Sequence, residues 1–266
     1  KDGLVYLNGE VSLEPYIARA RSTFGGEFLP DCQKIAVPQD KLLVMGDNRT
    51  GSGDSRHDVG FIAYEDVQYV LPFEKQKGKL DKNWRDPSSD LHATSKIKMD
   101  KNRYLRFLNE KRRETGVKEL KNQPRLELSA AKRGEIILRF NDFSFEATRS
   151  GYTMQRAMNE VGYSNIVWSE APIQGYYDAD ELIENLFEFP DWKEFLLERG
   201  YQEIGIAEVE GEINGCPTQV LVQHFAGYIP PNYSKEDIES WRSSLNNLNE
   251  VIPSWEKARE YSRINQ

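Results

Sequence analysis

The sequence predicts a multi-domain protein in which a mainly-β segment is followed by an α+β domain and a C-terminal helix. Three changes in composition and in the spacing of apolar residues along the chain support this fold class. Short apolar runs divided by Gly, Pro and Asp fill residues 1–73, and a charged stretch without aliphatic periodicity covers residues 74–98. Helical spacing followed by strand-like runs fills residues 99–232, and a second helical pattern fills residues 233–266.

Five apolar runs in residues 1–73 have the length and the bounding residues of strands. They cover residues 4–6, 35–37, 42–45, 61–63 and 67–71. Asn8 and Gly9 are the residue types of a two-residue hairpin turn. We therefore expect an all-β body, from which residues 19–30 form a surface excursion.

Residues 74–98 have the polar and charged composition of a linker. This linker separates the β segment from the helical pattern that begins at Met99. We expect His92, which lies within it, to be exposed to solvent and to have no function.

Apolar residues recur at helical spacing in the α+β domain. The expected helices cover residues 99–116, 124–140, 154–158, 179–186 and 192–197, and the expected strands cover residues 203–209 and 219–228. Both strands are apolar enough to be central in a sheet. His224 falls in the second strand, where we expect a half-exposed side chain rather than a ligand.

The C-terminal pattern predicts an amphipathic helix. Ser234 precedes an acidic first turn, which is a capping pattern. The apolar residues at helical spacing up to Pro253 are Ile238, Trp241, Leu245, Leu248 and Ile252. We expect this helix to lie on a domain or a partner, because its polar face lacks the basic residues of a membrane-surface helix.

Composition excludes several classes of protein. The formal net charge of −8 argues against a nucleic-acid partner, because phosphate binding requires a basic face. No apolar run approaches the ~20 residues of a membrane span. The chain opens with Lys1 rather than Met, so we expect it to be a fragment of a longer protein. The spacing of Cys32 and Cys216 is not that of a metal site, and the sequence does not decide whether they pair.

The most informative stretch is residues 46–61, which read GDNRTGSGDSRHDVGF. In an extended segment Asp54 and Arg56 lie on one face, so they can pair or hold neighbouring backbone. Taken residue by residue, the stretch is better explained as a polar loop with a surface ion pair.

Taken as a whole, this stretch resembles the block GDNR-x-x-S-x-DSR-x-x-GF of the bacterial type I signal peptidases. The matching positions are Gly46, Asp47, Asn48, Arg49, Ser52, Asp54, Ser55, Arg56, Gly60 and Phe61. Three residues separate Arg56 from Gly60 where the family has two. Residues 2–9 resemble the DG-x-x-Y-x-NG hairpin of the family, and residues 37–38 resemble its VP lead-in.

The resemblance implies a serine endopeptidase that removes signal peptides from exported preproteins at the extracytoplasmic face of the bacterial cytoplasmic membrane, without a cofactor. Family members use a serine nucleophile and a lysine general base, and an N-terminal helix anchors them. Both catalytic residues would precede Lys1, so we expect this chain alone to be inactive. By resemblance, Ser52 hydrogen-bonds the catalytic lysine. The positions that shape this wall of the site are Asp47, Asn48, Arg49, Asp54 and Arg56.

Residues 99–231 resemble the CAP domain of the cysteine-rich secretory protein and antigen 5 superfamily, which implies an α-β-α sandwich. The landmarks are Asn109-Glu110-x-Arg112, residues 126–131, Gly151-Tyr152-Thr153, Gly162-Tyr163, Leu196-Leu197, residues 204–207 and residues 222–225. Phe145 and Trp192 stand where many CAP domains place the two histidines of a cleft, and Glu170 matches a cleft glutamate.

We expect no metal in this domain, because one carboxylate without histidines holds zinc poorly. Glu170, Phe145 and Trp192 would then line an apolar cleft, unless the aromatic residues fill a core. The alternative to an enzyme is therefore a non-catalytic extracellular module, whose CAP domain contacts lipid, cell wall or another protein.

Overall fold

The computed structural model describes residues 1–72, 75, 85–92, 97–228 and 234–264. Contacts divide the chain into two compact units, Lys1–Tyr228 and Ile229–Gln266, so the predicted β segment and α+β domain share the first unit. Much of the linker predicted over residues 74–98 falls outside the described residues. His92 is exposed, as predicted.

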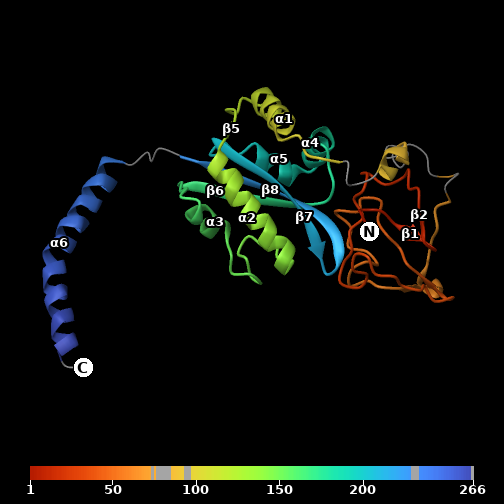
Figure 1. Ribbon diagram of the computed structural model, residues 1–266, viewed down its shortest axis with the longest axis horizontal. Helices are drawn as coiled ribbons and strands as arrows, with labels where there is room; N and C mark the ends of the chain where they lie inside the picture. Colours follow the sequence, from red (N-terminus) through yellow and green to blue (C-terminus); the bar gives the residue numbers. More distant parts are fainter. Residues whose placement is uncertain (73–74, 76–84, 93–96, 229–233, 265–266) are drawn as a thin grey trace. The chain divides into compact units, whose positions relative to one another are not determined.

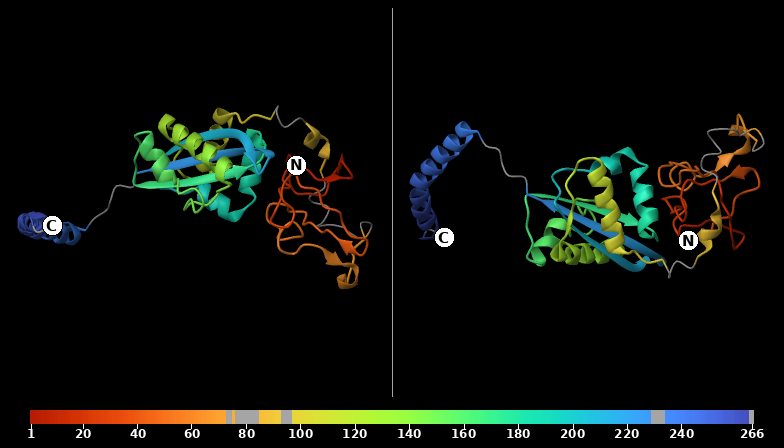
Figure 2. Two further views of the ribbon diagram at one scale, coloured as in Figure 1. Left: turned by 60° about the horizontal axis from the view of Figure 1, so that its bottom comes forward. Right: turned by 90° about the horizontal axis from the view of Figure 1, so that it is seen from above.

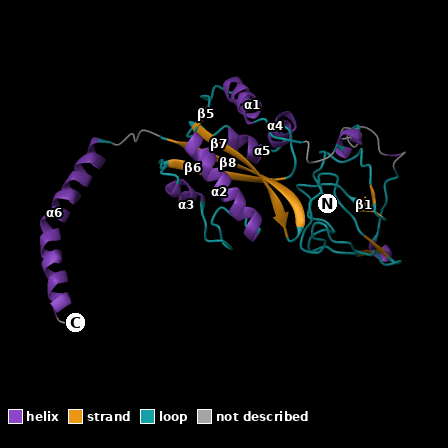
Figure 3. Ribbon diagram, in the orientation of Figure 1, coloured by secondary structure: helices purple, strands orange, loops and turns teal. Residues whose placement is uncertain are grey.

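Residues 1–72 are mainly turns and loops, with two short antiparallel ladders (Figure 3). Strand β1 (Tyr6–Leu7) pairs with β2 (Glu10–Val11), and β3 (Lys41–Leu42) pairs with β4 (Ile62–Ala63). Asn8 and Gly9 turn the first ladder with φ of 53° and 92°.

The expectation of an all-β body was too strong. Residues 35–37 and 67–71 form no strand. The apolar run after β3 is held partly by a side chain, because the Val44 N–H donates to Ser55 Oγ at 2.9 Å. Side chains thus satisfy backbone groups that a sheet would otherwise pair.

A four-stranded sheet forms the centre of residues 97–228, in the order β5-β7-β8-β6. The long strands β7 (Glu203–Ile213) and β8 (Cys216–Gly227) form a hairpin. Strand β6 (Val167–Gln174) lies antiparallel to β8, and the short β5 (Lys121–Asn122) runs parallel to β7.

Helices cover both faces of this sheet (Figure 1 and Figure 2). One face packs on α1 (Lys101–Glu114), α4 (Ala179–Phe187) and α5 (Pro190–Leu196). The other packs on α2 (Pro124–Phe140) and α3 (Met154–Glu160). All five helices were predicted, whereas β5 and β6 were not.

The alternation along the strands explains the two layers. On β8, Leu221 and Phe225 join the core under α1, α4 and α5. Val220 and Val222 point to the opposite face and join the core under α2. The side chains of β6 alternate in the same way, which decides where the candidate residues on this strand point.

The second unit contains α6 (Lys235–Ile264). Ser234 Oγ accepts a hydrogen bond from the Asp237 N–H at 3.0 Å, so the predicted cap is present. The helix continues through Pro253, beyond its predicted end. The predicted apolar stripe is exposed within this unit. In the described part of the chain, none of the helices combines the length and apolar character that crossing a membrane requires.

Candidate functional site

Arg49 anchors the turn that follows β3. Its guanidinium donates to both carboxylate oxygens of Glu14, from Nη1 at 3.0 Å and from Nη2 at 2.6 Å. Nη1 also donates to Thr23 Oγ1 at 2.6 Å, and Nε donates to the Gly46 carbonyl at 2.8 Å. Arg49 and Glu14 are both buried. The ion pair therefore fixes the turn against a segment 35 residues earlier in the chain.

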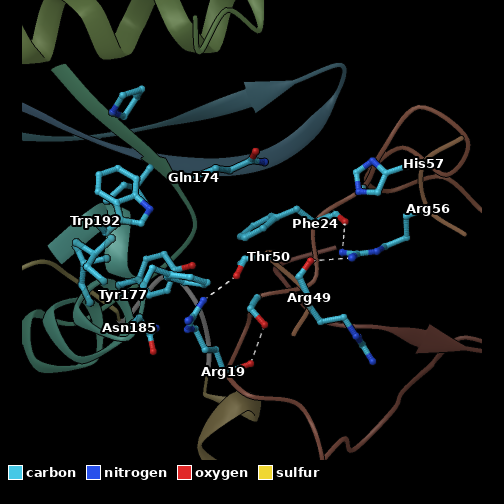
Figure 4. A pocket seen from close by; sticks show the side chains of 17 residues that line it. Arg19, Phe24, Arg49, Thr50, Arg56, His57, Gln174, Tyr177, Asn185 and Trp192 are labelled. Atoms are coloured by element: carbon cyan, nitrogen blue, oxygen red, sulfur yellow. Dashed lines mark hydrogen bonds between the residues drawn. The ribbon is translucent and has the colours of Figure 1, made fainter. Parts of the chain in front are cut away.

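Asp54 and Arg56 form the second buried ion pair of this segment. The pairing was predicted for an extended segment, whereas the two residues lie in a turn, in which the His57 N–H donates to the Asp54 carbonyl at 2.9 Å. Asp54 accepts from Arg56 Nε and Nη2, both at 2.8 Å, and from the Gly46 N–H at 2.9 Å. Arg56 also donates to the carbonyls of Phe24 at 3.0 Å and Arg49 at 2.7 Å (Figure 4). The pair is buried, so it organises backbone rather than lying on the surface.

The electrostatics of Asp54 follow from these contacts. Burial alone would raise the pKa of this carboxyl group. The hydrogen bonds from Arg56 and from the Gly46 N–H outweigh burial, so the pKa falls well below its ordinary value. Asp54 is therefore a carboxylate in the folded protein at neutral pH.

Ser52 lies against Gly46 on this wall. A Cβ built on Gly46 would come within 2.1 Å of Ser52 Oγ. Ser52 is half-buried, and among the described residues its hydroxyl has no hydrogen-bond partner. Gly46 is itself held by Arg49 and Asp54, so the buried network fixes the backbone against which Ser52 packs.

Asp47 and Asn48 do not join the buried network. Neither is buried, and Asp47 Oδ1 accepts from the Asn48 N–H at 2.9 Å. The Asp47 carbonyl accepts from the Ala18 N–H at 3.0 Å. These two residues shape the turn locally, whereas Arg49, Asp54 and Arg56 connect it to the rest of the segment.

Glu170 is buried and bound by two side chains from other elements. Arg133 Nε on α2 donates to both of its oxygens at 3.1 Å, and His224 Nε2 on β8 lies 3.0 Å from Oε2. His224 is 0% exposed, so the expectation of a half-exposed side chain was wrong. The β8 alternation turns His224 under α2, where Ser129 Oγ is 2.7 Å from Nδ1.

Burial lowers the pKa of His224, although the Glu170 carboxylate opposes this effect. Ser129 Oγ also donates to the Leu126 carbonyl at 2.9 Å, so a chain of polar contacts runs from the α2 backbone through Ser129 and His224 to Glu170. The group satisfies polar atoms between α2 and the sheet. In the described part of the chain, no group of three or more His, Cys, Asp or Glu side chains could hold a metal ion.

The structure separates Trp192 from Glu170 and Phe145, because Trp192 packs on the opposite face of the sheet. Phe145 is 44% exposed and stacks on Trp168 with ring centroids 5.6 Å apart. Trp192 packs on Phe195 at 5.8 Å and joins the core on the other face of the sheet. The three residues therefore do not line one common cleft.

Sequence reasoning did not identify several partners. Glu14 and Arg133 are the counter-ions of Arg49 and Glu170, and only the fold brings each pair together. Cys32 forms a disulfide with Cys216, with Cα atoms 5.6 Å apart. Even cysteine number permitted this bond but did not establish it.

The first part of the chain is similar to one known family. Residues 1–70 match the model of the family described as "Signal peptidase, peptidase S26". Signal peptidase I T of Bacillus subtilis is 37% identical over 70 residues, covering 25% of this chain and 36% of the relative. Signal peptidase I of Bacillus licheniformis is 40% identical over 65 residues, covering 23% of this chain and 35% of the relative. The chain thus spans about a third of the length of these relatives.

Solved structures provide a second comparison. An outer surface protein from Borrelia burgdorferi has a TM-score of 0.39 at 16% identity, over 46% of this chain and 88% of that one. An extracellular protein containing an SCP domain from Bacillus anthracis has a TM-score of 0.39 at 13% identity, over 47% of this chain and 39% of that one.

Proposed function

We propose that residues 1–70 form the C-terminal part of a signal peptidase I catalytic domain and that the protein removes signal peptides from exported preproteins. The observation that carries the proposal is the buried network of Glu14, Arg49, Asp54 and Arg56 around Gly46, within the segment that matches the signal peptidase family. This network supports the proposal because it fixes Gly46, against which the Ser52 hydroxyl packs.

In this proposal Ser52 orients the general base and is not the nucleophile. A lysine can accept the proton of a serine nucleophile only when it is neutral, which requires burial and correctly placed hydrogen-bond partners. Ser52 supplies such a partner, and the ion pairs behind Gly46 keep it from shifting. Asp47 and Asn48 hold the turn at the edge of this wall.

The catalytic serine and lysine are expected outside these 266 residues. The family segments S-M-x-P-T and K-R-x-x-G-x-P-G-D, which carry the two residues, do not occur in the printed sequence. We therefore expect the 266-residue chain alone to cleave no preprotein. A membrane anchor, which family members carry as an N-terminal helix, is part of the same proposal.

The disulfide supports an extracytoplasmic location. Disulfides persist in oxidising compartments and are rare in the cytosol of most bacteria. The Cys32–Cys216 bond joins the peptidase-like segment to β8, so both would face the same compartment. This agrees with signal-peptide removal at the outer face of the cytoplasmic membrane.

The test is cleavage of a preprotein by the native protein purified from its source membranes, with the cleavage site identified by mass spectrometry. We expect one cut after a small side chain. Ser52→Ala should slow this cut by up to about tenfold, because a hydrogen bond between neutral groups contributes ~0.5–1.5 kcal/mol. Ser12→Ala, which changes another half-buried serine of the same segment, should leave the rate unchanged.

Two results would contradict this proposal. Equal rates for the wild-type protein and Ser52→Ala would remove the role of Ser52. A folded native protein that cleaves no preprotein would instead favour a non-catalytic binding module.

A further inference from the structure

Helix α6 is one continuous helix whose large apolar residues follow a strict seven-residue period (Figure 1). The six residues, at alternating steps of three and four, are Ile238, Trp241, Leu245, Leu248, Ile252 and Trp255. We call these six residues the seam. Alternating steps of three and four average about 3.5 residues, which is the period of the a and d positions in a coiled coil. The seam therefore has the spacing of a helix that pairs with another helix.

The seam is also narrow. A helix that packs on a globular domain has an apolar face at least ~100° wide, with further apolar residues beside the central stripe. Between Lys235 and Lys257 the only apolar residues outside the seam are Val251 and Pro253. Pro253 directly follows the a position of Ile252 and so lies on the outer side of the heptad. This pattern fits a second helix better than it fits the surface of a domain.

The side chains of the seam expose much of their surface. Leu245 is 57% exposed, Leu248 is 52% exposed and Trp255 is 73% exposed. Removing such apolar surface from water is favourable, and large apolar side chains grouped on one face mark an interaction site. The seam therefore gains from burial against an apolar partner.

The charges beside the seam argue against a membrane surface as this partner. From Lys235 to Lys257 the helix carries five carboxylates and three cationic side chains, so this stretch is negative. Helices that lie on membranes carry an excess of Lys and Arg, which binds anionic lipids. A second apolar helix fits both the spacing and the charge.

We propose that the seam pairs with the seam of a second copy of this chain, in an antiparallel two-stranded coiled coil. Such a pair is isologous, because each copy uses the same surface. Trp255 would face the partner's Ile238, and Trp241 would face the partner's Ile252. The two leucines of each copy would fill the centre. Each large tryptophan thus meets a smaller residue across the seam, which favours close packing.

The same pairing brings opposite charges together at both ends of the seam. Lys235 and Glu256 both lie at e positions of the heptad, and e positions face each other in an antiparallel pair. Lys235 would then lie beside the partner's Glu256, and the two-fold symmetry repeats this contact at the other end. Within one chain the two residues are about 30 Å apart along the helix, so they cannot pair with each other.

A parallel pair would be less favourable. It would oppose Trp241 to the partner's Trp241 and Trp255 to the partner's Trp255, so two layers would be crowded. It would also place Asp237 beside the partner's Arg242. The Asp237 carboxylate already accepts from Ser234 Oγ at 2.8 Å, in the cap of the helix. The antiparallel pair leaves this cap as it is.

Sedimentation velocity of the 266-residue chain over a concentration series measures the association. We expect a reversible species of twice the 30.7 kDa of one chain. Leu248→Glu places a charge in the apolar centre and should weaken the association by at least about tenfold. Asn247→Glu adds the same charge one position earlier, on the outer side of the helix, and should leave the association unchanged. Circular dichroism verifies that each variant is folded.

Reversal of the end charges tests the orientation. Lys235→Glu creates two like-charged contacts per dimer and should weaken the association by about fivefold or more, as should Glu256→Lys. A mixture of the two variants should associate as tightly as the wild type, because the mixed pair has opposite charges at both ends. Lys235→Glu also adds an acidic residue to the first turn, which favours the helix. Weaker association of this variant therefore does not arise from a less stable α6.

The inference rests on α6 alone and does not depend on the proposed peptidase function. A dimer that Leu248→Glu weakens, and that the mixed charge variants restore, would support it. A chain that stays monomeric up to its highest soluble concentration would overturn it and assign the seam to another partner or surface. An assembly of more than two copies, a dimer that Leu248→Glu does not weaken, or charge variants that associate like the wild type would also overturn it.

Discussion

At the scale of single residues, Gly46 determines the position of Ser52. Its missing side chain leaves the space that the Ser52 hydroxyl occupies, and both of its backbone polar groups are bound by buried side chains. Glycine serves here for close approach rather than for a positive φ. The small residue and the serine therefore act as one unit.

We predict that Gly46→Ala destabilises the protein by about 1–3 kcal/mol, the usual cost of overpacking. The new Cβ would lie 2.1 Å from Ser52 Oγ and 2.6 Å from Ser52 Cβ. Urea unfolding measures the change. Gly53→Ala is the matched control, because a Cβ there meets nothing within 4 Å. Adding Ser52→Gly should recover much of the loss, and an equal loss in both backgrounds would contradict the mechanism.

The carboxylate of Asp54 predicts an acid-dependent loss of stability. Its folded-state pKa is depressed, so the unfolded chain binds a proton at a higher pH than the folded chain does. The stabilisation is present above the unfolded pKa of ~3.9 and is lost as pH falls below it. Asp54→Asn should flatten the dependence of unfolding free energy on pH below about 4.

Chemical unfolding at a series of pH values provides the measurement. Asp58→Asn, which removes an exposed carboxylate of the same stretch, should retain the wild-type slope. An unchanged slope in Asp54→Asn would show that this pair does not contribute to the acid response.

Only contacts between residues close in sequence could be predicted at this site. Asp54 and Arg56 pair across two positions, because a carboxylate and a guanidinium this close in sequence can meet in a turn as well as in an extended segment. Glu14 reaches Arg49 and Arg133 reaches Glu170 only through the fold. We expected a half-exposed His224 because a polar side chain in a strand-like run more often faces water, but the fold buries it between β8 and α2.

At the scale of elements, α2 lies unusually close to β7. A Cβ on Gly205 would come within 2.1 Å of the Glu127 backbone nitrogen in the first turn of α2. A backbone atom cannot relieve such a clash by changing rotamer, as a side chain can, so any residue with a Cβ would force α2 and β7 apart. Gly205 therefore permits the short distance between this helix and this strand.

We predict that Gly205→Ala destabilises the protein by at least about 2 kcal/mol, since α2 must move off the sheet. Thermal unfolding measures the effect. Gly211→Ala on the same strand is the control, because its Cβ meets only the end of the Leu138 side chain at 2.9 Å. That variant should stay within about 1 kcal/mol of the wild type. Equal losses for the two variants would contradict the explanation.

Helices were predicted better than strands, for identifiable reasons. Pro124 begins α2 at a position that needs no N–H, and Asn141 ends it with φ of 49°, so both ends were visible in the sequence. Strand β6 contains Glu170 and Pro172, which interrupt an apolar pattern. Only pairing with β8 over its whole length shows that it is a strand.

At the scale of the molecule, the Cys32–Cys216 disulfide joins the peptidase-like segment to the central sheet. We predict that Cys32→Ser combined with Cys216→Ser lowers the stability of the first unit by about 2–5 kcal/mol, mainly because the unfolded chain gains freedom. Urea unfolding of the variant and of the wild-type protein measures the difference. Thiol labelling in denaturant without reductant should modify neither wild-type cysteine, and labelling of both would contradict the bond.

The whole-molecule organisation was predictable where the sequence carries a long motif. Residues 46–61 indicated a resemblance to the signal peptidases, and the family model that matches residues 1–70 confirms this resemblance. The disulfide was not predictable, because 184 residues separate the two cysteines and only the folded chain places them within bonding distance.

The same bond determines what proteolysis can release. Residues 32–216 form a covalent ring, so a protease that cuts once inside it opens the ring without freeing a fragment. A nicked molecule would migrate as one species until reductant is added, and then as two. A cut after Cys216 lies outside the ring and would release α6 at once. A cut within residues 32–216 therefore leaves the molecule covalently intact, whereas a cut before Cys32 or after Cys216 does not.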